Sequence, residues 1–378
     1  MPTTPDPGAA DEAAEPTQRQ PAADERRALA RAWLSGLDPA LGIDPDSLRP
    51  ASSDASFRRY FRVDCRAAPS LIVMDAPPAH EDCRPFVRAA GLLAARGVHT
   101  PRIAAADLDA GLLLLSDLGP TTYAQAMEEA PEETGRLYRD ALAALLRLQR
   151  PPANAPDPAA ALPPYDRGRL LNEMRLFPEW YVARHLKVEL DARELALLEA
   201  LFERLVEAAL AQARVLVHRD YHCRNLMRVD ADARLPGPDG KPIAANPGVL
   251  DFQDAVYGPI TYDLVSLLRD AYVEWPEDRQ IDWAARYWEQ AREARLPVPE
   301  RFDAYWRDLE WMGLQRSLKV LGIFARLCYR DGKQRYLADL PLVLRHTQRV
   351  AERYDAFAGF ARLLDRVHQR TPVTGFTF

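Results

Sequence analysis

The chain has 378 residues, enough for two lobes that each have a hydrophobic core. With 48% hydrophobic and 28% charged residues and a formal net charge of -6, it has an ordinary soluble composition without a basic excess for nucleic acid. No apolar run approaches the roughly 20 residues needed to span a membrane, and the 4 cysteines lie far apart, which indicates reduced thiols. We therefore expect a cytoplasmic protein without a membrane or nucleic-acid partner.

The first residues are expected to form a tail and a short helix. Residues 1–24 are rich in Pro, Ala, Asp and Glu, which is typical of a disordered segment and unlike a secretory signal. A helix is predicted from residue 25 to about residue 37, where apolar residues recur at helical spacing. Its predicted apolar face comprises Leu29, Ala32, Trp33 and Leu37.

Strands and one helix are predicted next. Apolar runs indicate strands at residues 60–63 and 71–74, and another strand after Ile103. Between them, residues 86–96 have helical periodicity, and the helix is expected to stop at Gly97.

A loop of small and hydroxyl-bearing residues is predicted at residues 51–56. Small residues let backbone N–H groups approach a polyphosphate closely, and the hydroxyl groups add donors. The loop has no glycine, so a structural Ser-rich turn is the alternative. The candidate nucleotide-binding residues here are Ser52, Ser53, Asp54, Ala55 and Ser56.

Residues 111–119 contain four consecutive leucines followed by a Gly-Pro stop. This pattern resembles the strand and hinge that join the two lobes of a kinase, where the backbone would read adenine. Ser116 and Leu118 are the candidates for that nucleotide contact.

The remainder of the chain is predicted to be mostly helical. Helices are expected at about 132–149, 166–187 and 191–213, with several more between 262 and 367. A Pro-rich linker at 150–164 and a hairpin at 230–247 interrupt them. The order of elements predicts an α+β, bilobal, protein-kinase-like fold. Its parts are a disordered tail at 1–24, a β-rich nucleotide-binding lobe at 25–118, and a mostly helical catalytic and substrate-binding lobe at 119–378.

The clearest chemical signal lies at residues 215–225 and 248–254. Two short apolar runs each end in a carboxylate. His218, Arg219 and Asp220, followed by Asn225, have the spacing of a kinase catalytic loop, in which Asp receives the proton of the acceptor hydroxyl and Asn holds a metal ion. We predict that Asp220 is the catalytic proton acceptor and that Asn225 and Asp251 are ligands of Mg²⁺, a hard cation that prefers oxygen.

Two other interpretations of this segment exist. Asp and Asn at strand ends are common turn residues, and His218, His222 and Cys223 have side chains of the kind that bind zinc. The kinase spacing after a β-type run favours phosphoryl transfer.

Two further carboxylates are singled out. Asp254 lies three residues past Asp251 and is a candidate to contact either a second metal ion or the substrate. Asp263 is expected in the first turn of a helix, where it either caps that helix or links it to the catalytic loop.

A helix predicted at residues 309–330 carries two stripes. One stripe is apolar, and the other contains Gly322. Glycine within a helix costs roughly 1 kcal/mol relative to alanine, so Gly322 is expected to serve packing or the approach of a ligand. Lys319 and Arg326 are candidates for an anionic substrate group, and a solvated basic face is the alternative. The candidate substrate-binding residues are Gln315, Lys319 and Arg326, together with Glu173 on the helix at 166–187.

Residues 218–225, 250–254 and 258–264 together resemble the aminoglycoside phosphotransferase (choline-kinase-like) family. The resemblance implies a bilobal enzyme that uses ATP and Mg²⁺ to phosphorylate the hydroxyl groups of small molecules. Protein kinases are the poorer match, because the chain has no D-F-G triplet and no A-P-E element.

Roughly residues 30–365 are similar to the bacterial kinases that act on the anomeric (C1) hydroxyl of N-acetylmuramate and N-acetylglucosamine. Segments 49–60, 74–78, 81–86, 114–119, 313–326 and 329–333 carry this likeness. It implies formation of sugar 1-phosphates in peptidoglycan recycling, with a uridylyltransferase as the pathway partner that makes the UDP-sugar. A choline or aminoglycoside kinase and a nucleotide-binding pseudokinase are the alternatives.

One feature departs from the family pattern. Met74 stands near the expected place of the phosphate-binding lysine, and Arg88 stands about where its glutamate partner is expected. Either Arg58, Arg59 or Arg62 contacts phosphate instead, or loop amides and Mg²⁺ hold the nucleotide.

Overall fold

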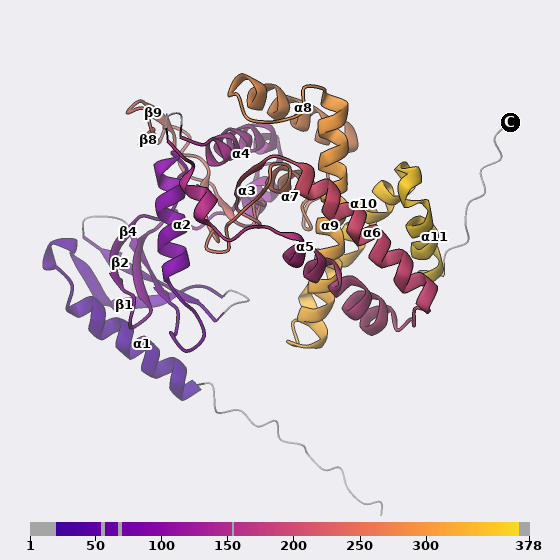
Figure 1. The fold of residues 1–378 in the computed structure, drawn as a ribbon. Helices are drawn as coiled ribbons and strands as arrows, with labels where there is room; N and C mark the ends of the chain where they lie inside the picture. The colour runs from indigo at the N-terminus through magenta and orange to yellow at the C-terminus, as the bar shows by residue number, and fades with distance from the viewer. Residues whose placement is uncertain (1–19, 54–56, 67–69, 153–154, 370–378) are drawn as a thin grey trace, which may run out of the picture. The chain divides into compact units, whose positions relative to one another are not determined.

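The computed structural model describes residues 20–53, 57–66, 70–152 and 155–369 (Figure 1). The chain divides into two compact units. Unit 1 comprises the chain up to Arg84 together with Arg102–Asp117, and unit 2 comprises Pro85–Pro101 and the chain from Leu118 onward. The sequence placed residues 85–101 in the first lobe, whereas they belong to unit 2. The Phe86 ring contacts Phe252 there, and the His99 carbonyl accepts from the Val249 amide at 2.7 Å.

Unit 1 is built on an antiparallel five-stranded sheet with the strand order β1-β2-β3-β5-β4. The three strand regions expected from apolar runs and the leucine-rich strand are present. The strands are β1 (Ile43–Ser53), β2 (Arg59–Cys65), β3 (Ser70–Asp75), β4 (Ile103–Asp107) and β5 (Leu112–Ser116).

Strand β1 was not predicted, and it corrects the loop assigned to residues 51–56. It contains two prolines and pairs with β2 through two irregularities of register. Prolines and bulges are tolerated on an edge strand, where one side of the backbone needs no partner. The ladder continues to Ser53, which pairs with Arg59, so residues 51–53 are strand; residues 54–56 lie outside the described ranges.

One face of this sheet packs against helix α1 (Gln20–Ser35). Alternate residues of β2, β3 and β5 point to this face, as the two-residue period of a strand requires. The helix contributes Ala30 and Leu34 to the core, and Trp33 and Leu37 pack partly against it, as predicted. The predicted face was wrong at Leu29 and Ala32, which are exposed. The buried sheet residues are Leu48, Phe61, Val63, Leu71, Val73, Leu112 and Leu114.

Unit 2 is mostly helical, as predicted. Its longest helix, α9 (Phe302–Tyr329), packs against α5, α6, α7 and α10 (Figure 1). The other α-helices are α2 (Arg84–Ala95, with its first residue in unit 1), α3 (Tyr123–Glu129), α4 (Thr134–Gln149), α5 (Arg167–Met174), α6 (Ala192–Ala211), α7 (Tyr262–Leu268), α8 (Glu277–Glu293), α10 (Leu340–Arg353) and α11 (Ala358–Val367). Short 3-10 turns are η1 (Pro39–Leu41), η2 (Pro131–Glu133), η3 (Pro158–Ala161), η5 (Gln334–Asp339) and η6 (Asp355–Phe357).

Two helical predictions need correction. The helix expected at 166–187 is divided into α5 and a π-helical segment, η4 (Phe177–Leu186). Pro178 stands at the start of η4 and has no N–H for the α-helical ladder, which accounts for the change. Helix α3 was missed, although Thr122 and Gln125 form a capping box at its start.

Short strands in unit 2 flank the segments that carry the predicted chemistry. β6 (Arg214–Val217) pairs with β11 (Val256–Pro259), and β7 (Leu226–Met227) pairs with β10 (Gly248–Val249). The predicted hairpin is present as β8 (Arg234–Pro236) and β9 (Pro242–Ala244). Among the helices in the described ranges, none has both the length and the apolar character needed to cross a bilayer.

Candidate active site

The two carboxylate-bearing strands bring the predicted catalytic residues together. β6 leads into Asp220, and β10 leads through Leu250 into Asp251. The Leu250 amide donates to the Asn225 carbonyl at 2.9 Å. The Asn225 side-chain Nδ2 donates to the Asp220 carbonyl at 2.9 Å and to Asp251 Oδ2 at 3.3 Å. Asp220, Asn225 and Asp251 therefore lie in one site on unit 2.

The backbone at this site adopts a conformation that is rare for residues with side chains. Arg219 has φ of 79° and Asp251 has φ of 61°. The left-handed region costs free energy for residues other than glycine, and such residues occur mainly where a functional side chain must be aimed. Both positions directly flank or carry the predicted catalytic groups.

Two buried carboxylates hold the loop at residues 218–225. Asp263, in the first turn of α7, accepts from the backbone amides of His218 at 2.7 Å and of Arg219 at 3.0 Å. Asp270, just past the end of α7, accepts from the amides of Cys223 at 3.1 Å and of Tyr272 at 3.0 Å. Of the two roles considered for Asp263, the link to the catalytic loop is confirmed.

His218 is engaged at both ring nitrogens. Its Nδ1 accepts from the Asp220 amide at 3.2 Å, and its Nε2 donates to the Leu250 carbonyl at 2.9 Å. Burial lowers the pKa of His218, which keeps the ring neutral, as this pair of bonds requires. The zinc interpretation is therefore wrong for His218, because neither nitrogen has a lone pair left for a metal.

A buried group of charged and polar side chains lies beside Asp220, and Glu173 is at its centre. Arg219 Nη2 donates to Glu173 Oε1 at 2.6 Å, and Lys319 Nζ lies 3.4 Å from the same oxygen. The other Glu173 oxygen accepts from Gln315 Nε2 at 3.2 Å and from the Tyr165 hydroxyl. Lys319 also donates to the Tyr262 hydroxyl at 3.0 Å. We call Glu173, Arg219, Lys319, Gln315, Tyr165 and Tyr262 the Glu173 cluster.

The protonation states within the Glu173 cluster favour the charged forms. Burial opposes ionisation of Glu173, but Lys319 and Arg219 outweigh it and lower its pKa. Burial likewise opposes the charge of Lys319, and Glu173 outweighs it and raises the pKa. The cluster is therefore a charged ion network inside the protein, where breaking one partner leaves an uncompensated charge.

The half-buried Asp220 carboxylate lies next to the charged groups of the Glu173 cluster. Burial would raise its pKa, yet Lys319, His222 and Arg219 together lower it below the usual range. Within the described part of the chain, no hydrogen bond to the Asp220 carboxylate is formed. Asp220 is thus an ionised carboxylate with lone pairs available for an incoming hydroxyl group.

The other substrate candidates divide between two environments. Gln315 and Lys319 are buried and bonded to Glu173, so the alternative of a solvated basic face is wrong for Lys319. Arg326 is half-buried and lies outside the Glu173 cluster, and Asp254 is exposed. Gly322 has a packing reason, because a Cβ atom there would lie 2.4 Å from the Leu176 backbone carbon. Their contacts with a substrate stay a prediction.

Several predicted nucleotide contacts lie in unit 1, where Ser52 and Ser53 end strand β1. The Ser116 hydroxyl accepts a hydrogen bond from the backbone amide of Arg102 at 2.8 Å. Leu118 opens unit 2, and its side chain packs close to Gly248. The assignments to nucleotide binding stay predictions. The remaining candidates, Asp54, Ala55 and Ser56, lie outside the described ranges.

Two of the three arginines considered as replacements for the missing lysine, Arg59 and Arg62, are held by carboxylates in unit 1. Arg59 pairs with the fully buried Asp75 at 2.5 Å, and Arg26 pairs with the same carboxylate. Arg62 pairs with Asp117 at 2.5 Å. Met74, which precedes Asp75 and stands near the expected place of the lysine, is buried. An arginine that contacts phosphate would have to share or exchange its carboxylate partner.

Sequence reasoning missed Tyr165, Tyr262 and Asp270. Buried tyrosines and an aspartate past a helix end are common structural residues, so their types gave no signal. Asp263 stands in the first turn of α7 and Asp270 two residues past its last residue, so no helical period relates them. Both meet the catalytic loop.

The two predicted metal ligands lie side by side, because Asn225 Nδ2 donates to Asp251 Oδ2 as well as to the Asp220 carbonyl. Gln253 Nε2 donates to the other Asp251 oxygen at 2.7 Å. Within the described residues, Asn225 Oδ1 accepts no hydrogen bond. An amide oxygen and a carboxylate suit a hard divalent cation. The donor set fits Mg²⁺.

The fold and this site define a class of phosphotransferases. A model of the phosphotransferase enzyme family matches residues 47–305, more than half of the chain, and the chain belongs to this family. The match includes Asp220, Asn225, Asp251 and Asp263.

Relatives of known name cover almost the whole chain. It is 48% identical over 344 residues to an N-acetylmuramate/N-acetylglucosamine kinase of Pseudomonas aeruginosa, covering 89% of this chain and 95% of the relative. An enzyme of the same name from Neisseria meningitidis is 43% identical over 357 residues, covering 94% of this chain and 100% of the relative.

Solved structures confirm the kinase-like fold. A choline/ethanolamine kinase family protein from Mesorhizobium loti is similar with a TM-score of 0.58 at 15% identity, covering 91% of this chain and 99% of that one. A choline kinase from Streptococcus pneumoniae is similar with a TM-score of 0.53 at 12% identity, covering 88% and 99%.

Proposed function

We propose that this chain transfers the γ-phosphate of ATP to the anomeric hydroxyl of N-acetylmuramate and N-acetylglucosamine. The observation that supports this most directly is the Asp220–Asn225–Asp251 site in a chain 48% identical over 344 residues to a kinase named for these two sugars. The ionised Asp220 carboxylate supplies the proton acceptor that such a transfer needs.

The reaction follows from the roles of these residues. Asp220 orients the C1 hydroxyl and accepts its proton, while a bond forms between the sugar oxygen and the γ-phosphorus and the bond to the departing ADP oxygen breaks. An anomeric hydroxyl is more acidic than an ordinary alcohol, so a carboxylate with a lowered pKa is a sufficient base. Asn225 and Asp251 would hold Mg²⁺, which neutralises phosphate charge when bound.

The product of this reaction defines the proposed setting. A sugar 1-phosphate is the substrate type that a uridylyltransferase converts into a UDP-sugar. A cytoplasmic kinase followed by such an enzyme would return both amino sugars from peptidoglycan to cell-wall synthesis.

An assay of ADP release tests the proposal. N-acetylmuramate, N-acetylglucosamine, glucose, choline and an aminoglycoside are each supplied with ATP and Mg²⁺. We expect turnover with the two N-acetylated amino sugars and a product labile to mild acid, as anomeric phosphates are. Turnover only with choline or the aminoglycoside would contradict the proposal.

The buried Met74 at the usual lysine position motivates one alternative, a nucleotide-binding pseudokinase. Thermal stabilisation by Mg-ATP without phosphorylated product from any of these acceptors would support it. The complete set of Asp220, Asn225 and Asp251 favours catalysis.

A further inference from the structure

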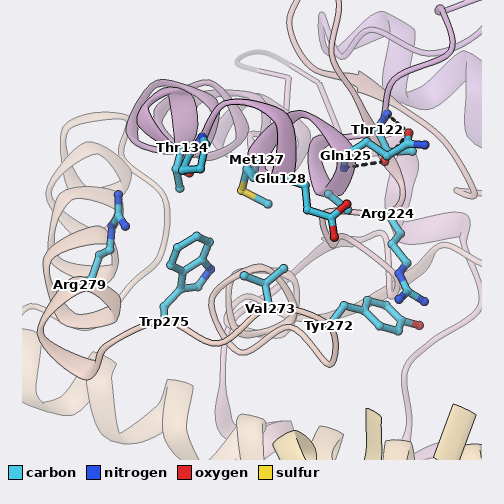
Figure 2. A pocket seen from close by; sticks show the side chains of 12 residues that line it. Thr122, Gln125, Met127, Glu128, Thr134, Arg224, Tyr272, Val273, Trp275 and Arg279 are labelled. Carbon is cyan, nitrogen blue, oxygen red and sulfur yellow. Dashed lines mark hydrogen bonds between the residues drawn. The ribbon is translucent and has the colours of Figure 1, made fainter. Parts of the chain in front are cut away.

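Unit 2 has a cavity of about 630 Å³ beside the catalytic loop (Figure 2). Helix α3 forms one wall, and the segment at residues 272–275 after α7 forms the facing wall. The volume falls within the range of about 300–1,000 Å³ that holds small-molecule ligands. We call this cavity the Arg224 pocket.

The Arg224 pocket is attached directly to the catalytic loop. Arg224 precedes the proposed metal ligand Asn225 and lies four residues after Asp220. The Ala124 amide, in the wall formed by α3, donates to the carbonyl of Cys223 at 3.1 Å. Asp270 binds the amides of both Cys223 and Tyr272, so the loop and the facing wall share one buried anchor. A ligand in the pocket would lie next to the loop that carries the proton acceptor.

The cations that line the pocket are held by aromatic rings. The Arg224 guanidinium lies 3.5 Å from the centre of the Tyr272 ring. Arg279 lies 4.9 Å from the Trp275 ring and 4.8 Å from the Trp283 ring. Within the described ranges, neither arginine forms an ion pair or a hydrogen bond. Stacking fixes the guanidinium planes while their N–H donors stay available for a ligand.

The charge and surface of the pocket indicate the kind of ligand. Its lining has two arginines and one carboxylate, Glu128, which Figure 2 shows projecting from α3 toward the facing wall. Trp275 donates its indole N–H to the Tyr138 hydroxyl at 2.7 Å, which fixes the ring. A planar guanidinium is suited to a carboxylate, and an aromatic ring offers an apolar surface to a sugar.

We propose that the Arg224 pocket is an acceptor subsite in which the Arg224 guanidinium binds the carboxylate of a sugar acid. The proposal rests on the proposed function, because N-acetylmuramate carries a lactyl carboxylate that N-acetylglucosamine lacks. Arg224 is then a specificity residue that favours the acidic sugar. This role differs from that of Lys319, whose ammonium group is already bonded to Glu173 and Tyr262.

Kinetics with the two sugars test this subsite. The values of kcat/KM are measured for both sugars, and KM is measured for ATP, in the wild type and in Arg224→Gln. Loss of a charge-assisted hydrogen bond predicts a decrease of about 10- to 100-fold in kcat/KM for N-acetylmuramate. The value for N-acetylglucosamine and the KM for ATP should change less than about threefold. Arg224→Lys should recover part of the loss, since it keeps the charge without the planar fork.

Two further variants separate the subsite from general charge effects. Arg228→Gln removes the same charge four residues further on, where Arg228 lies 3.6 Å from Glu129, and should not distinguish the two sugars. Arg326→Gln tests the other arginine considered for the carboxylate. Equal losses for both sugars in Arg224→Gln, an increased KM for ATP instead, no loss, or selectivity lost only in Arg326→Gln would each overturn the proposal.

Direct binding keeps the subsite distinct from the proposed function. Calorimetric titration of N-acetylmuramate and N-acetylglucosamine into the wild type and Arg224→Gln does not require turnover. At least tenfold weaker binding of N-acetylmuramate alone in the variant would support the subsite even if neither sugar were phosphorylated. No binding of N-acetylmuramate by the wild type, or equal binding by the variant, would overturn it.

Discussion

Asp220 illustrates how single residues set the chemistry of this site. A proton acceptor must be ionised and must have free lone pairs, but a strongly lowered pKa also makes it a weaker base. Burial and the charge of Lys319 act in opposite directions on the pKa of Asp220, and the cations prevail. An acidic acceptor hydroxyl suits this balance, because it needs less basicity from the enzyme.

Replacement of Lys319 by Met should shift the pH dependence of the reaction. The value of kcat/KM falls when Asp220 becomes protonated at low pH. Since Lys319 lowers the pKa of Asp220, its removal should raise that pKa and move the acidic limb of the profile to higher pH. Lys241→Met, on the exposed hairpin, is the control. An acidic limb that stays in place or moves to lower pH would contradict this role for Lys319.

Asp263→Asn tests the support of the catalytic loop. Asparagine has one acceptor oxygen where Asp263 binds two amides, so a buried N–H loses its partner at a cost of about 1–3 kcal/mol. Urea unfolding measures this loss, and Asp282→Asn on the surface of α8 should have little effect. Wild-type stability and turnover in Asp263→Asn would contradict a role for Asp263 in holding the catalytic loop.

The same variant should lose a pH dependence of stability. Burial raises the pKa of Asp263 to about 6, whereas the unfolded chain has an ordinary value near 4. The folded state therefore binds the proton more tightly, and the wild type gains stability as the pH falls from about 6 toward about 4. Asp263→Asn lacks this gain, so its deficit in unfolding free energy should be larger at pH 5 than at pH 7. A constant deficit would contradict the assignment.

At the scale of secondary-structure elements, two helices position the site. Asp263 in the first turn of α7 and Asp270 just past its end bind the catalytic loop. Helix α9 supplies Lys319 and Gln315 to the Glu173 cluster. The close approach of η4 to α9 depends on Gly322, which packs against Leu176. The apolar period of α9 was readable from the sequence. The burial of its polar stripe was not, because it depends on partners from α5 and α7.

Gly322→Ala should destabilise the chain through this contact. The added Cβ would lie 2.4 Å from the Leu176 carbon, and overpacking of this kind costs about 1–3 kcal/mol. Gly91→Ala is the matched control, since a Cβ at Gly91 in α2 meets nothing within 4 Å and alanine favours a helix by about 0.5–1 kcal/mol. Thermal unfolding compares the two. Equal effects would show that Gly322 has no packing role.

At the scale of the whole molecule, the sequence predicted the order of a strand-rich part and a helical part and placed Asp220, Asn225 and Asp251 together. These residues could be predicted because short apolar runs and fixed spacing are local signals. Strand β1 escaped prediction because its prolines and aspartates disfavour strands and only pairing with β2 forms it. Asp270 and the tyrosines of the Glu173 cluster escaped it because their roles come from contacts between distant segments.

The most direct test of the central claim is the rate of phosphoryl transfer to N-acetylmuramate in Asp220→Asn. Asparagine keeps the size of the side chain but cannot accept the hydroxyl proton, so turnover should fall by about 10²- to 10⁴-fold. ATP binding, measured on the same preparation, should stay close to that of the wild type. Turnover like the wild type in Asp220→Asn would contradict the account.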